Sequence, residues 1–152
     1  MKNIFFATKK KGISIIEVLM VIAIISILAG TSASGYFYFK KGNDLSISEA
    51  QVANAIRKTQ NRAKAMANDD AWGIDISENR ALIFKGTNFS GRTQSYDISI
   101  PLRGLSSVSG KTQIIFYKLT GLPYAASIGT LVLGNGTNTK NIQINAEGLV
   151  SY

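Results

Sequence analysis

Three acidic side chains near the middle of the chain could offer oxygen ligands to calcium. They are Asp69, Asp70 and Asp75. A loop of the EF-hand type needs oxygen ligands at short, regular intervals, and the residues between Asp70 and Asp75 supply no carboxylate. A solvated turn between a helix and a strand therefore explains the cluster better than a metal site, and no resident metal or cofactor is expected.

A basic stretch at residues 57–64 raises the possibility of nucleic-acid binding. On a helix, Arg57 and Lys64 share one face while Lys58 and Arg62 share another, so the charges are spread around the axis. A DNA-binding surface gathers its cations on one face or stripe. A solvated helix face is the favoured interpretation, and a DNA-binding module remains an alternative.

Cysteine and histidine are absent from all 152 residues. This excludes disulfides, zinc fingers, Ser-His triads and any acid–base catalysis by histidine. The glycine-rich residues 134–138 lack the lysine and the following helix of a phosphate-binding loop, and they predict a hairpin turn. An enzyme is therefore the least favoured class, behind an assembled structural subunit and a DNA-binding module.

The apolar residues gather near the N-terminus. No charged residue occurs from Val18 to Phe39, which as a helix is about 33 Å long and matches a hydrocarbon core of about 30 Å. From Val18 to Ala29 every face is apolar, with Ser26 the only polar residue. A membrane-spanning helix over residues 13–41 is therefore predicted. A secretory signal cleaved near residues 29–33 is the alternative, but its apolar core would be too long.

The charges around this helix predict its orientation and one unusual contact. Four lysines precede the segment and two follow it, which favours a cytoplasmic N-terminus. Glu17 lies inside the apolar run, where a carboxylate costs about 2.5–3.5 kcal/mol at the membrane centre and less near its edge. Such a residue needs either a partner or a position among the lipid headgroups.

Residues 10–29 together resemble the class III signal of type IV prepilins and type II secretion pseudopilins. The shared pattern is a short basic leader, a glycine (Gly12), an apolar residue (Ile13), a glutamate at the fifth mature position (Glu17) and a long apolar helix. The family usually has Phe or Met where this chain has Ile13. It also often has a proline about twenty residues into the mature helix, where this chain has Gly30, Ser34 and Gly35.

The resemblance implies a processing and assembly pathway. Prepilin peptidase would remove a leader, residues 1–12, by cleaving between Gly12 and Ile13, and Ile13 would then be N-methylated. In the family, the glutamate that corresponds to Glu17 pairs with the terminal amine of a neighbouring subunit. The implied partners are other pilins or pseudopilins, the inner-membrane assembly platform and membrane lipid. The implied location is the inner membrane, crossed once, with the C-terminal domain outside and a filament after assembly.

Residues 42–152 predict a soluble pilin-like domain. A helix is expected over about residues 44–68, capped by Asp44 or Ser46 with Glu49 completing a capping box. It should continue the membrane helix, with a possible break at residues 42–43. Its apolar stripe comprises Leu45, Val52, Ile56, Ala63 and Met66.

Short alternating runs make residues 71–152 rich in predicted strands. The candidates are residues 72–76, 81–85, 96–100, 113–118, 129–133, 141–145 and 149–152. The layout of the C-terminal half is similar to that of GspH/FimT-type minor pseudopilins. The expected fold is α+β, with a long N-terminal membrane-spanning helix that continues into an amphipathic helix packed on an antiparallel β-sheet. The expected function is that of a minor pseudopilin or pilin in a type II secretion or type IV pilus-like filament. The alternatives are a DNA-binding competence pilin and, least favoured, a signal-anchored enzyme.

Overall fold

The computed structural model describes residues 12–152, without the side chains of residues 31–35 and 38. The chain forms two compact units, residues 1–38 and residues 39–152. The predicted leader lies outside the described residues except for Gly12.

Helix α1, Ile15–Lys64, supplies all the regular structure described in the first unit. Its first turn is closed at the carbonyl of Ser14, which accepts the backbone N–H groups of Glu17 at 3.0 Å and Val18 at 3.3 Å. Within the part of the chain that the structure describes, no helix is both long enough and apolar enough to cross a membrane. The membrane-spanning helix predicted over residues 13–41 is therefore not confirmed.

In the second unit, α1 is helical from Phe39 to Lys64. The predicted break at residues 42–43 is wrong, because both residues are helical. The predicted capping box is wrong for the same reason. The hydroxyl of Ser46 donates to the carbonyl of Gly42 at 3.2 Å, which is the bond that a serine makes inside a helix.

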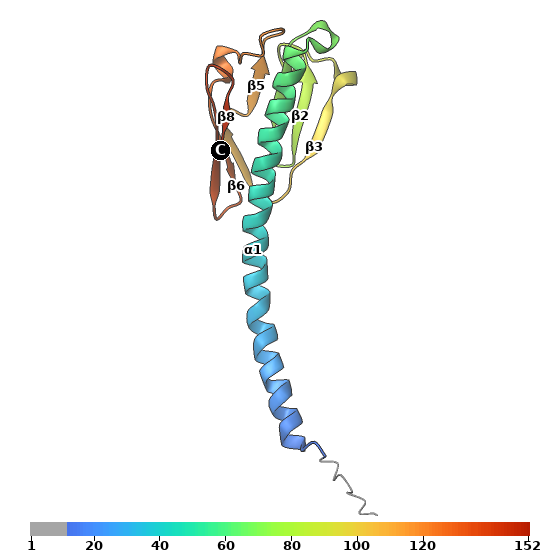
Figure 1. Ribbon diagram of the computed structural model, residues 1–152, viewed down its shortest axis with the longest axis vertical. Helices are drawn as coiled ribbons and strands as arrows, with labels where there is room; N and C mark the ends of the chain where they lie inside the picture. The colour runs from blue at the N-terminus through green and yellow to red at the C-terminus, as the bar shows by residue number, and fades with distance from the viewer. Residues whose placement is uncertain (1–11) are drawn as a thin grey trace, which may run out of the picture. The chain divides into compact units, whose positions relative to one another are not determined.

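Within residues 12–152, eight strands form two antiparallel four-stranded sheets, shown with α1 in Figure 1. One sheet has the order β3 (Ile98–Pro101), β2 (Arg80–Lys85), β1 (Trp72–Ile76) and β5 (Gln113–Phe116). The other has the order β4 (Ser107–Gly110), β6 (Gly129–Gly134), β7 (Thr139–Ile144) and β8 (Val150–Ser151). Short 3-10 helices occur at Ala67–Asp69, Gln94–Tyr96 and Ala125–Ser127. The predicted α+β class is confirmed, and the strands divide between two sheets.

The core of the second unit lies where α1 meets the sheets (Figure 1). The predicted stripe is buried at Leu45, Val52, Ile56 and Ala63. Met66 is instead 44% exposed, because α1 ends at Lys64 and Met66 has a left-handed φ of 50° beyond it. Both sheets contribute side chains to the same cluster, among them Trp72, Ile74, Ile83, Phe116, Leu131, Leu133, Ile142 and Ile144. Burial of one large apolar side chain contributes about 1.5–3 kcal/mol, so this cluster stabilises the contact between helix and sheets.

Candidate assembly site

The segment from Ile13 to Leu28, which includes the start of α1, is mainly apolar and exposed. Among its large apolar side chains the exposed fraction runs from 46% at Val18 to 83% at Ile15. The one polar side chain after Glu17 in this stretch is that of Ser26, whose hydroxyl donates to the carbonyl of Ile22 at 2.8 Å. Because that bond lies within the helix, Ser26 can enter an apolar environment with its donor satisfied.

Glu17 lies in the first turn of α1, where a negative charge is favourable because the helix N-terminus carries a partial positive charge. Glu17 and Ile13 line one shallow, mainly apolar depression together with Val18, Val21 and Ile22. Among the described residues, Glu17 makes no ion pair. The predicted cleavage position and the predicted assembly glutamate thus line the same depression.

Gly12 and Gly30 have open space beside them among the described residues. A Cβ atom built on either glycine would meet no atom of the described residues within 4 Å. Gly30 and Ser26 belong to a four-residue spacing of small residues that permits close helix approach. The side chain of Ser34, the third member, lies outside the described residues.

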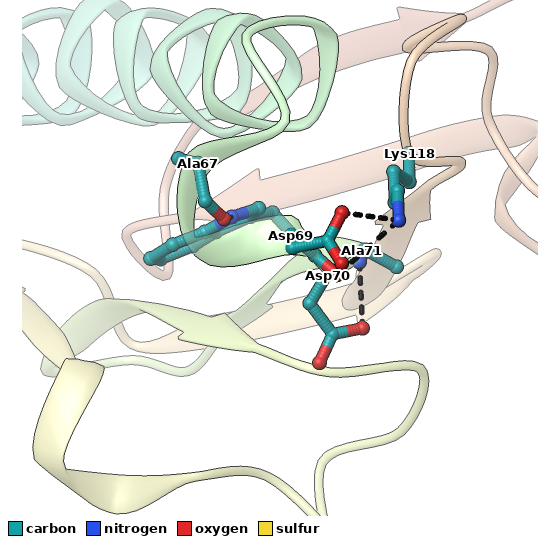
Figure 2. Close-up of polar contacts among 6 residues, drawn as sticks. Ala67, Asp69, Asp70, Ala71 and Lys118 are labelled. Atoms are coloured by element: carbon teal, nitrogen blue, oxygen red, sulfur yellow. Dashed lines mark hydrogen bonds and ion pairs between the residues drawn. The ribbon is translucent and has the colours of Figure 1, made fainter.

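The acidic cluster forms the predicted turn between helix and strand, as Figure 2 shows. Asp69 makes an ion pair with Lys118, and the carboxylate of Asp70 accepts the N–H of Ala71 at 2.7 Å. The hydrogen bond and the charge of Lys118 hold the pKa of Asp69 below its ordinary value. Asp69 is thus engaged by a lysine that follows β5, and Asp70 by a backbone donor within the turn.

Asp75 lies apart from this turn, on strand β1. Its partial burial raises the pKa of its carboxyl, against the opposing charges of Arg80 and Arg92. Within the described residues, no three carboxylates come together in an arrangement that could hold a metal ion.

Two of the four basic side chains at residues 57–64 pack against the protein's own aromatic rings. The guanidinium of Arg62 lies 4.7 Å from the ring centre of the buried Trp72. Arg57 lies 5.4 Å from the ring centre of Tyr152 and donates to the carbonyl of Val150 at 3.2 Å. The contact of Arg62 with Trp72 is of the cation–π type, which stabilises the folded chain.

The sequence prediction missed an ion pair whose carboxylate is buried. Glu49 is buried, and its Oε2 lies 3.0 Å from Nζ of Lys140 on β7. Next to it, the hydroxyl of Ser48 donates to the carbonyl of Arg103 at 2.7 Å. The sequence feature that could have predicted this pair is the position of Glu49, four residues after Leu45 and three before Val52. This spacing places Glu49 on the apolar stripe of the helix. A carboxylate there requires a partner in the sheet.

One comparison with known proteins gave a match. A family model described as the prokaryotic N-terminal methylation motif matches residues 7–33. Neither a curated protein nor a solved structure gave a match. The matched segment contains Gly12, Ile13, Glu17 and most of the exposed apolar helix surface. The chain therefore carries the prokaryotic N-terminal methylation motif, the class III prepilin signal, and is consistent with the type IV pilin-like family.

Proposed function

We propose that this chain is a minor pilin or pseudopilin subunit of a type IV pilus-like or type II secretion filament, which acts by assembly and not by catalysis. One observation carries the proposal: the methylation motif at residues 7–33 overlaps the start of α1, where the large apolar side chains from Ile15 to Leu28 are exposed. Leaving each large apolar side chain in water would cost about 1.5–3 kcal/mol, so this part of the helix needs an apolar environment. In a filament, the helices of other subunits can provide such an environment.

Before assembly, the uncharged stretch from Val18 to Phe39 holds the subunit in the inner membrane. The four lysines ahead of it keep the N-terminus in the cytoplasm, and the domain of residues 42–152 lies on the opposite side. The platform that assembles the filament then transfers the helix from lipid to a protein environment of similar polarity. Little apolar surface becomes exposed to water in that exchange.

Processing takes place at Gly12 and Ile13. Prepilin peptidase cleaves between these two residues, and the new terminus at Ile13 is N-methylated. The open space around Gly12 and its lack of a side chain suit close approach by the peptidase to the backbone.

Glu17 then pairs with the terminal amine of Ile13 in a neighbouring subunit. A carboxylate and an ammonium are each costly alone in an apolar filament core, and each reduces the cost of the other when they are paired. The absence of an ion pair at Glu17 among the described residues is compatible with a partner on another chain.

DNA binding is not favoured as a second function. Arg57 and Arg62 already contact Tyr152 and Trp72, and the cations of this stretch do not form one stripe along the helix.

Co-expression with a prepilin peptidase tests the proposal. The unmodified chain should shift to lower mass on a gel, and Gly12→Val should remain full-length because a branched side chain obstructs the cleavage position. Gly30→Val is the matched control, since the same change in equally open surroundings lies beyond the cleavage position and should be processed. Processing of Gly12→Val at the normal rate would contradict the proposal.

A further inference from the structure

The turn that joins β6 to β7 contains the chain's only Asn-Gly pair, Asn135-Gly136. Oδ1 of Asn135 accepts the backbone N–H groups of Thr137 at 3.0 Å and Asn138 at 2.8 Å. Nδ2 of Asn135 donates to the carbonyl of Lys41 on α1 at 3.0 Å. The side chain thus closes the turn and also fixes it to the helix.

We propose that Asn135 is a site of spontaneous deamidation and that this turn promotes the reaction. The backbone nitrogen of Gly136 attacks Cγ of Asn135 and gives up its proton to solvent. The bond from Cγ to Nδ2 then breaks, and Nδ2 takes a proton from water and leaves as ammonia. Water opens the resulting succinimide ring to aspartate or isoaspartate, so that one water is consumed for each ammonia released.

The two hydrogen bonds to Oδ1 of Asn135 are the feature of the turn that promotes deamidation. Attack on Cγ places negative charge on Oδ1, and the N–H groups of Thr137 and Asn138 are already directed at that atom. Donors positioned in advance stabilise a developing oxyanion without further reorganisation. Gly136 has no side chain to obstruct ring closure, and a Cβ atom built on it would meet only the hydroxyl of Ser106, at 3.5 Å.

The reaction would remove one hydrogen bond between the β6–β7 turn and the helix. A carboxylate at position 135 has no N–H donor for the carbonyl of Lys41, so two acceptor oxygens would face each other. The product therefore loses a contact between the β6–β7 turn and the residues of α1 that begin the second unit. This inference is independent of the proposed function, because it depends only on the turn.

Timed incubation of the full chain in detergent at mildly alkaline pH tests the inference. Tryptic peptides are analysed by tandem mass spectrometry for the gain of about 1 Da that accompanies conversion of the amide to an acid. Asn135 should convert before every other asparagine. Its rate in the folded chain should exceed that in urea by about two- to tenfold, less than in an enzyme because these donors are exposed to solvent.

The comparison between folded and denatured chain decides the outcome. A rate in the folded chain equal to or below the rate in urea would overturn the inference, because the turn would then give no assistance. Asn135→Gln serves as the control, since its longer side chain forms a succinimide analogue much less readily and the mass gain at this position should disappear. Asn135→Asp, which imitates the product, should lower the Tm relative to the unmodified chain.

Discussion

The carboxylate of Glu49 on α1 lies 3.0 Å from the ammonium of Lys140 on β7, and the Glu49 side chain is only 8% exposed. A charged group with so little access to water depends on its partner for compensation. The pair therefore fixes the orientation of the helix against the sheet of β4, β6, β7 and β8.

Replacement of Lys140 by methionine should destabilise the chain, because it leaves the Glu49 carboxylate buried without a countercharge. The expected loss in the free energy of unfolding is about 1–3 kcal/mol, below that of a fully buried pair because the Lys140 side chain is 43% exposed. Urea denaturation of the full chain in detergent measures it. The double change Glu49→Gln with Lys140→Met should recover most of the loss. If Lys140→Met were as stable as the unmodified chain, the pair would contribute nothing to stability.

Replacement of Glu17 by valine should leave leader cleavage intact but reduce incorporation into filaments, because the terminal amine of a neighbouring Ile13 loses its countercharge. Glu17→Gln, which keeps the shape but removes the charge, should behave in the same way. Sheared filament fractions probed with an antibody measure incorporation, and Glu147→Gln, a neutralisation at an exposed turn, is the matched control. Normal incorporation of Glu17→Val would refute the pairing.

The ionisation of Asp69 and that of Asp75 should change the stability of the folded chain in opposite directions. The pKa of Asp69 is lowered by Lys118 in the folded chain. Its contribution to stability is therefore present above pH 3.8, the ordinary pKa, and is lost as the pH falls through the lower pKa of the folded state. The pKa of Asp75 is raised by burial, so its contribution is present below 3.8 and is lost as the pH rises through the folded value. Lys118→Met should therefore reduce the Tm at neutral pH more than at low pH.

Asp75→Asn completes this comparison, because it removes the cost of holding a charged carboxylate in a partly buried position. It should raise the Tm at neutral pH and have a smaller effect in acid. Thermal unfolding followed by circular dichroism across the acid range measures both variants. Parallel pH profiles for the two variants would contradict the opposite signs of the two pKa shifts.

Much of the fold could be predicted from the period of the apolar residues. Strand β1 was predicted with its observed bounds because Trp72, Ile74 and Ile76 alternate with residues that face away from the core. Strand β4 was missed, since Ser107–Gly110 contains a single apolar residue, Val108, and resembles a turn. Its pairing with β6 is a tertiary contact that no local pattern encodes.

The helix boundaries show the same limit. Gly42 and Asn43 predict a break because both residues are poor helix formers, but α1 continues through them. The burial of Leu45 and Ser48 soon after these residues shows the tertiary packing that can outweigh such weak local preferences. The spacing of Ser46 and Glu49 likewise predicts a capping box from local sequence alone. In the structure the partner of Glu49 is Lys140, 91 positions away in sequence.

Mass spectrometry of the N-terminus of the native chain, isolated from membranes that contain its own prepilin peptidase, tests most directly whether this is a processed filament subunit. The expected result is a chain that begins at Ile13 with a methylated amine, about 14 Da heavier than the unmethylated terminus. A chain that retains residues 1–11, or one cut near Ala33 as by a secretory signal peptidase, would contradict both the processing and the assembly through Glu17.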